Sequence, residues 1–175
     1  MKKFLNVFTA KLFIMKNILL LLISLFSVQL LAQNHADYKE SLKNGLSYGI
    51  DGDSTLAILG KPDFVGDKEL WGATGNYYQE WIYSDIGLTL IMESISDTST
   101  PIVHCMEITK NPSLCTSKGV CIGVSREFVV EQYKVCMNTN LSTNSIIVIG
   151  DLYKGLYIYI QDEIVVKMVL GFVAE

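Results

Sequence analysis

Few side chains of this chain have the types and spacing that catalysis requires. The 175 residues include two histidines, His35 and His104. A nucleophile needs a neighbouring base, usually a histidine oriented by a carboxylate. His35 falls in a polar stretch with nothing to hold it, and strand alternation places Cys105 on the opposite face from His104. We therefore expect His104 to be a packed strand residue and the protein not to be an enzyme.

Paired carboxylates offer acid–base chemistry without histidine. One pair precedes a helical run, where the helix dipole favours negative charge, and two lie in loops. An Asp-x-Asp can open a calcium loop, but Leu56 stands where that loop needs glycine, and no glycine-rich phosphate loop is present. We expect structural or solvated carboxylates, no metal and no cofactor. The pairs are Asp51 with Asp53, Asp67 with Glu69, and Asp162 with Glu163.

The four cysteines, Cys105, Cys115, Cys121 and Cys136, contain no Cys-x-x-Cys pair. This spacing disfavours a zinc ribbon or a thioredoxin-like site. An even number in an exported chain predicts disulfides, and three pairings stay open. We expect at least one bridge to involve Cys115, because its loop would otherwise expose a thiol. The alternative is four reduced, buried cysteines.

Aromatic side chains gather between Trp71 and Tyr83. Trp81 lies in an alternating strand pattern and should fill the core. Trp71 lies between glycines in a long loop, 64–76, where nothing demands burial. Trp and Tyr are enriched at binding hot spots, so Trp71, Tyr77 and Tyr78 are the predicted binding residues. The alternative is that these aromatics only fill the core.

The N-terminal region predicts export. Basic residues precede an apolar run over 18–31, and the small residue Ala32 follows it. This order is typical of a secretory signal peptide over 1–32. An uncleaved anchor is the alternative, but a spanning helix needs about 20 apolar residues. Met15 offers a second start. We expect a periplasmic or secreted protein with no stable membrane span after cleavage.

The charge of the remaining chain excludes one class of partner. Residues 33–175 carry 10 basic and 18 acidic side chains, a net charge of −8. Phosphate backbones would repel such a domain, so we expect no nucleic-acid binding.

The elements that must position these residues form two similar groups. A polar tether is predicted over 33–47, a first unit over 48–110 and a second over 118–171. Each unit has a short helix followed by three strands in an antiparallel sheet, which makes the fold class α+β. The two groups match at offsets of 74 and 68 residues, which predicts an internal duplication, with coincidence as the alternative. The predicted helices are 54–59 and 126–133, and the strands are 77–83, 87–93, 102–108, 146–149, 155–160 and 164–170.

A glycine-led cap precedes a short helix that ends Leu59-Gly60-Lys61-Pro62-Asp63, and aromatic-rich strands follow. This pattern resembles the tandem α/β repeats of the β-lactamase inhibitory protein family, and it is similar to the SmpA/OmlA (BamE-type) envelope lipoproteins. The resemblance covers roughly 47–171. It implies an exported, non-catalytic module that binds protein partners through its sheet. The lipobox of the lipoproteins is missing, and no inhibitor contact residue carries over. The alternative function is binding of a small ligand or carbohydrate on the aromatic platform.

Overall fold

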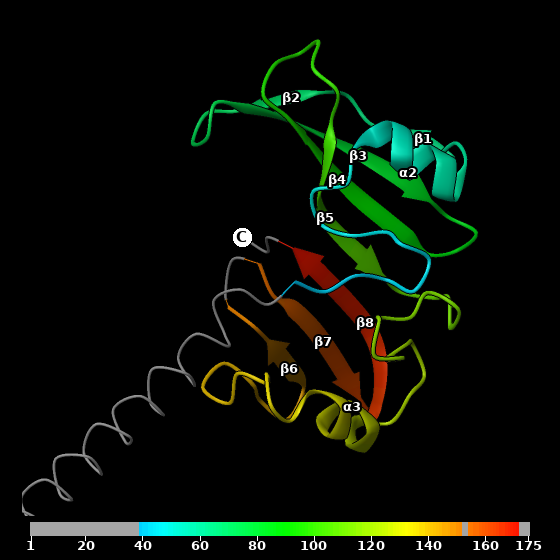
Figure 1. The fold of residues 1–175 in the computed structure, drawn as a ribbon, viewed down its shortest axis with the longest axis vertical. Helices are drawn as coiled ribbons and strands as arrows, with labels where there is room; N and C mark the ends of the chain where they lie inside the picture. The colour runs from blue at the N-terminus through cyan, green and yellow to red at the C-terminus, as the bar shows by residue number, and fades with distance from the viewer. Residues whose placement is uncertain (1–38, 152–153, 172–175) are drawn as a thin grey trace, which may run out of the picture. The chain divides into compact units, whose positions relative to one another are not determined.

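The computed structural model describes residues 39–151 and 154–171 (Figure 1). All described residues belong to one compact unit, 37–175. The predicted signal peptide, 1–32, and the first part of the predicted tether lie outside the described residues.

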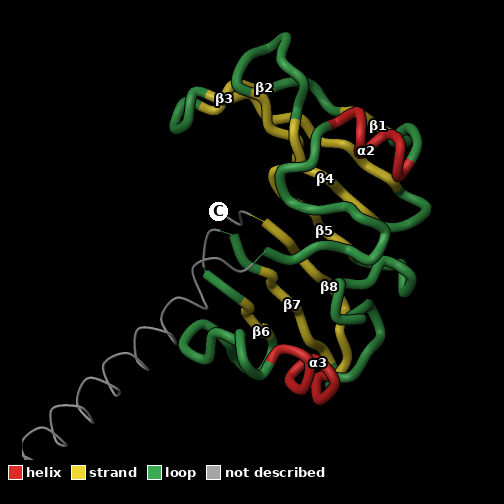
Figure 2. Tube along the Cα trace, in the orientation of Figure 1, coloured by secondary structure: helices red, strands yellow, loops and turns green. Residues whose placement is uncertain are grey.

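The described residues form one antiparallel sheet of eight strands and two short helices (Figure 2). The sheet order is β1-β3-β4-β5-β8-β7-β6, and β2 also pairs with β3 beside β1. Along the chain the elements are α2 (Gly52–Leu59), β1 (Phe64–Val65), β2 (Glu69–Trp71), β3 (Asn76–Tyr83), β4 (Leu88–Ser94), β5 (Ile102–Ile108), α3 (Arg126–Tyr133), β6 (Ile146–Ile149), β7 (Leu156–Gln161) and β8 (Ile164–Gly171).

The prediction of two helix–three-strand units, each with its own antiparallel sheet, is wrong. The fold is sheet-rich, and its strands form a single sheet because Cys105–Ile108 of β5 pair with Met168–Gly171 of β8. Strands β1 and β2 were also missed, since the glycines between 66 and 75 interrupt the strand pattern. The positions of the other six strands agree with the predicted ranges to within one residue at either end.

Side-chain caps begin both helices; α3 begins at the predicted residue, and α2 begins two residues before the predicted start at 54. The Asp51 carboxylate accepts hydrogen bonds from the Ser54 N–H at 2.9 Å and the Ser54 hydroxyl at 2.8 Å. The Ser125 hydroxyl accepts the Phe128 N–H at 3.2 Å. These bonds satisfy backbone donors that have no partner inside the helix.

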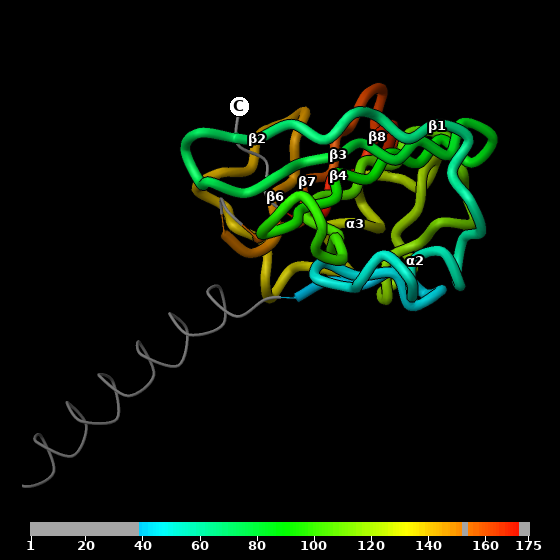
Figure 3. Tube along the Cα trace, turned by 90° about the horizontal axis from the view of Figure 1, so that it is seen from above, coloured from blue at the N-terminus to red at the C-terminus, as the bar shows by residue number. Residues whose placement is uncertain are grey.

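Both helices pack on one face of the sheet, which we call the helix face (Figure 3). The opposite surface is the open face. Ile91 and Glu93 lie on it because they alternate along β4 with buried core residues, and Tyr78 lies on it because it is the cross-strand partner of Glu93. The core between the helices and the sheet includes Leu56 and Leu59 of α2, Val129 and Tyr133 of α3, and Leu90, Met106, Ile158 and Met168 of the strands.

Residues 39–47 differ from the predicted tether. Leu42 and Leu46 are fully buried in the core, and Ser41 and Ser47 form a bridge that closes a tight turn. Glu40 is buried and accepts hydrogen bonds from Ser117 and Tyr133. The many polar residues of this segment predicted a tether, but it contributes two leucines to the core and a hydrogen-bonded carboxylate. The described part of the segment is therefore integral to the domain.

Candidate functional site

The structure brings together two of the three predicted binding residues. Trp71 lies at the end of β2, not in a loop, and its ring contacts the Tyr78 ring at 5.0 Å between centroids, with the planes 75° apart. Tyr77 follows the alternation of β3 and faces the other side of the sheet, where it pairs with Leu70 and Ser94. Tyr77 is therefore not part of the same surface as Trp71 and Tyr78.

A carboxylate, Glu93, organises the polar part of the site. Its Oε1 accepts hydrogen bonds from Asn76 Nδ2 at 2.7 Å and from the Tyr78 hydroxyl at 2.8 Å. Its Oε2 lies 3.0 Å from His104 Nδ1. Three side chains from β3 and β5 thus converge on one carboxylate of β4, which fixes their rotamers.

The local electrostatics keep Glu93 ionised. Burial alone would raise the pKa of its carboxyl, but the hydrogen bonds from Asn76 and Tyr78 and the nearby His104 outweigh burial, so the pKa is lowered. Burial, and then the hydrogen bond to Glu93, raise the pKa of the Tyr78 phenol. Burial, and then the charge of Glu93, also raise the pKa of the Tyr48 phenol. The cluster holds one fixed negative charge among neutral phenols.

The Tyr78 ring meets Trp71 and His104 edge to face, and Tyr48 meets His104 at a tilt of 51°. His104 contacts Tyr78 at 5.1 Å between centroids with the planes 84° apart, and it contacts Tyr48 at 6.0 Å. Tyr78 is therefore held between Trp71 and His104. Asn76, Glu93 and Tyr48 were not predicted as site residues. The cross-strand register brings Glu93 to Tyr78, and the hydrogen bond from the Gly49 N–H to the Val103 carbonyl at 2.7 Å holds the segment of Tyr48 beside β5.

The sequence-based separation of His104 and Cys105 is wrong. The β4–β5 register shifts between Ile91 and Met92, so β5 contains one extra residue and Val103 and Met106 both face the core. Such a bulge breaks the alternation of side chains. His104 reaches Glu93 on the open face, and Cys105 packs on that same face beside a small apolar cluster of Val148, Tyr157 and Val169.

The shared face does not make these two residues a reactive pair. Burial, and then the charge of Glu107, raise the pKa of Cys105 to about 11. A thiol with this pKa stays protonated at neutral pH and is a poor nucleophile. The Nδ1 of His104 is engaged with Glu93.

The two edges of the sheet differ in whether their backbone groups have partners within the chain. At the β6 edge, the Asn138 N–H donates to the Val148 carbonyl at 2.7 Å, and the Val148 N–H donates to the Ser142 hydroxyl at 3.0 Å. Among the described residues, no strand pairs with the outer side of β1 or β2. Uncovered edges are places where another chain can dock.

The uncovered edge also carries exposed apolar side chains. Leu70 is 59% exposed and Trp71 is 42% exposed, and Phe64 and Val65 are exposed as well. We call these four residues the β1–β2 edge patch. The strand pairings place Phe64 and Trp71 on the open face and Val65 and Leu70 on the helix face, so exposed apolar side chains flank the uncovered edge on both sides. Several large apolar side chains along one edge are typical of an interaction site, whereas single ones are not informative.

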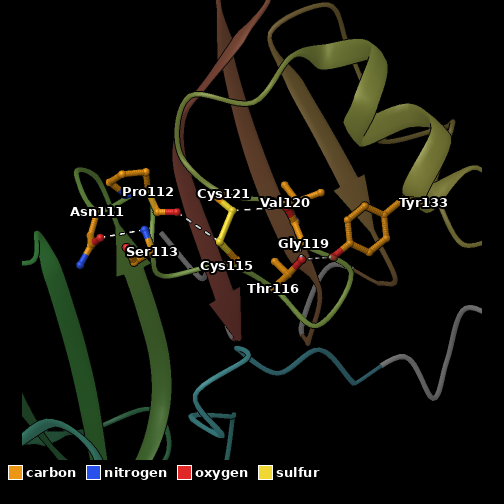
Figure 4. The surroundings of a disulfide bond; sticks show 9 residues. All are labelled: Asn111, Pro112, Ser113, Cys115, Thr116, Gly119, Val120, Cys121 and Tyr133. Carbon is orange, nitrogen blue, oxygen red and sulfur yellow. Dashed lines mark hydrogen bonds between the residues drawn. A yellow bond between two sulfur atoms is a disulfide. The ribbon is translucent and has the colours of Figure 1, made fainter.

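The predicted disulfide that involves Cys115 is confirmed. Cys115 is bonded to Cys121 (Figure 4). Cys105 and Cys136 are free thiols. The bridged loop holds the N-terminal segment, because the Lys43 N–H donates to the Cys115 carbonyl at 2.9 Å and the Ser117 N–H donates to the Ser41 carbonyl at 2.8 Å. A disulfide fits an oxidising compartment.

Two further findings concern residues 39–151 and 154–171. Within these ranges no helix combines the length and the apolar character needed to cross a membrane. The same ranges contain no group of three or more His, Cys, Asp or Glu side chains placed to hold a metal ion.

Comparisons with known proteins add no relative. A scan against protein-family models and searches of curated proteins and of solved structures found no match to this chain. The resemblance to the β-lactamase inhibitory protein and to the SmpA/OmlA lipoproteins therefore stays a prediction.

Proposed function

We propose that the protein is an exported, non-catalytic module of the periplasm or the secreted space that binds a protein partner. The observation that carries this proposal is the β1–β2 edge patch, Phe64, Val65, Leu70 and Trp71, on the uncovered edge of the sheet. The opposite edge is capped by the chain's own residues, so the exposure of β1 and β2 is not a general property of this sheet.

The patch has the composition of an interface centre. Trp71 combines a large apolar area with a fixed orientation, because it contacts Tyr78, whose hydroxyl is bonded to Glu93. Preorganised aromatic anchors lose little conformational entropy on binding. At an interface, truncation of such an anchor costs about 2 kcal/mol or more, which is roughly a thirtyfold loss of affinity.

Export is supported by the disulfide and by the order of residues in 1–32. Cys115–Cys121 requires oxidising conditions to persist. A basic start, an apolar run and a small residue at its exit are the features of a signal peptide.

The second candidate function is binding of a small ligand or carbohydrate. An open concavity of about 320 Å³ beside Trp71 and Tyr78 supports it, because ligand sites are concave and combine aromatic with polar groups. The loss of Tyr77 from this face leaves a smaller stacking platform than the sequence predicted.

Comparative affinity purification tests the main proposal. Tagged wild-type protein, Leu70→Glu and Val135→Glu are produced in the native host, and co-purifying proteins are quantified by mass spectrometry. Val135 is 75% exposed and follows α3, so it is a matched apolar control outside the patch. We expect a partner that is retained by Val135→Glu and lost from Leu70→Glu. Equal retention by both variants would contradict the proposal.

A further inference from the structure

The concavity beside Trp71 has a definite construction. It holds about 320 Å³ and is lined by Glu69, Leu70, Trp71, Tyr78 and Ile91, which we call the aromatic concavity. Glu69 and Tyr78 are direct cross-strand partners, so their side chains lie on the same face of the sheet. The rings of Trp71 and Tyr78 are nearly perpendicular and provide two aromatic walls.

These walls are held in place before any ligand arrives. The Tyr78 hydroxyl is fixed on Glu93, which also accepts from Asn76, the cross-strand partner of Trp71. His104 packs against the other side of Tyr78. At the base of the hairpin turn, the Gly75 N–H donates to the Trp71 carbonyl at 2.8 Å. The site is thus preorganised, which reduces the entropy lost on binding.

The electrostatic character of the concavity is negative. Glu69 lines it, and the exposed Glu80 is the cross-strand partner of Ile91. Glu93 lies on the same face next to Tyr78, but its carboxylate is engaged by His104, Asn76 and Tyr78, so Glu69 and Glu80 carry the negative character. No basic side chain is among the five lining residues, and neighbouring Lys68 directs its ammonium to the Asp97 carbonyl. Aromatic faces add to this, since their π-electrons attract cations within about 6 Å of the ring centroid.

We propose that the aromatic concavity receives an organic cation, the ammonium or guanidinium group of a Lys or Arg side chain on the protein partner. The cationic head stacks on Trp71 and Tyr78 and pairs with the Glu69 carboxylate, while the aliphatic stem packs on Ile91. This inference rests on the proposed function and names the chemistry by which the patch recognises its partner. An apolar side chain would leave Glu69 without a counter-charge.

Ligand-observed NMR with small cations tests the inference on the exported protein. The probes are Nα-acetyl-arginine amide and choline, and 3,3-dimethylbutan-1-ol is the neutral isostere of choline. We expect saturable binding of both cations and no saturable binding of the alcohol. Trp71→Leu should weaken the binding of both cations about two- to fivefold, the range for an exposed cation–π contact. Glu69→Gln should weaken it as well, and Glu131→Gln, an exposed carboxylate on α3, should not.

Four results would overturn the inference. Equal binding of the neutral isostere would show a merely apolar site. Absence of cation binding would remove the cation site, and the comparative purification would still decide the proposed function separately. Choline binding tenfold tighter than the arginine probe would assign the concavity to a free quaternary ligand instead of a partner side chain. Conversely, cation binding without a Leu70-dependent partner would reject the proposed function and, with it, the partner side chain as the source of the cation.

Discussion

The two tryptophans should respond to truncation very differently. Trp81 is 7% exposed, its Nε1–H donates to Gln79 Oε1 at 3.1 Å, and it packs against the start of α2 near Gly52. Trp71 is 42% exposed, and its ring contact is with Tyr78. We therefore expect Trp81→Ala to destabilise the protein strongly and Trp71→Ala to do so weakly.

The magnitudes follow from the buried area. A buried Trp removes about 200 Å² from water, and at about 25 cal/mol per Å² this is worth about 5 kcal/mol as an upper bound. Truncation of Trp81 should cost about 3–5 kcal/mol, because it also leaves a closed cavity. Trp71 buries roughly half of its area, and water can fill the space it leaves, so its truncation should cost about 1–2 kcal/mol.

Urea denaturation followed by circular dichroism measures both values, provided that the slopes of the transitions are unchanged. If Trp71→Ala lost as much free energy of unfolding as Trp81→Ala, Trp71 would be a core residue. The patch would then lack its anchor, and the exposure of Trp71 would not mark a binding surface.

Three further predictions concern the elements around the site. Thiol counting on unfolded, unreduced protein should find two free cysteines and not four. Replacing both Cys115 and Cys121 by Ser should lower the free energy of unfolding by about 2 kcal/mol, the chain-entropy value for so short a loop. The pKa of Glu93 is lower in the folded than in the unfolded state, so the stabilisation that its carboxylate provides is present above the unfolded pKa and is lost as pH falls through the folded pKa. In urea titrations at stepped pH, Glu93→Gln should therefore cost less free energy of unfolding at pH 3 than at pH 7, with Glu131→Gln as the control. An equal cost at both pH values would contradict this prediction. Tyr133→Phe should cost about 1–3 kcal/mol in the same assay, because it leaves a buried carboxylate with one hydrogen bond fewer; an unchanged midpoint would show that this hydrogen bond contributes nothing.

The local structure was largely predictable from the sequence, because its signals are local. Ser125 and Asp51 cap the helices as their side-chain chemistry requires. β-branched and aromatic alternation located six strands. The union of both halves into one sheet was not predictable, since the pairing of β5 with β8 joins residues about sixty positions apart and has no short-range signal.

The candidate site was predicted in part for the same reason. The glycine-flanked Trp71 marked the region, but the register that brings Asn76 and Glu93 to Tyr78 is a property of the assembled sheet. The bulge that turns His104 and Cys105 to one face cannot be read from Ile102–Ile108, which alternates plausibly without it. Tyr77 was assigned to the site by proximity in sequence, and strand alternation removes it.

Site-specific photo-cross-linking in the native host tests directly whether the β1–β2 edge patch contacts a protein partner. A photoreactive amino acid replaces Leu70 in one variant and Val135 in another, both of which are exposed apolar positions. Cross-linking from Leu70 to one defined protein, lost when Trp71→Ala is added and not seen from Val135, is the predicted result. Identical products from both positions, or no product from Leu70 while Val135 captures a partner, would contradict the assignment of the β1–β2 edge patch as the binding surface.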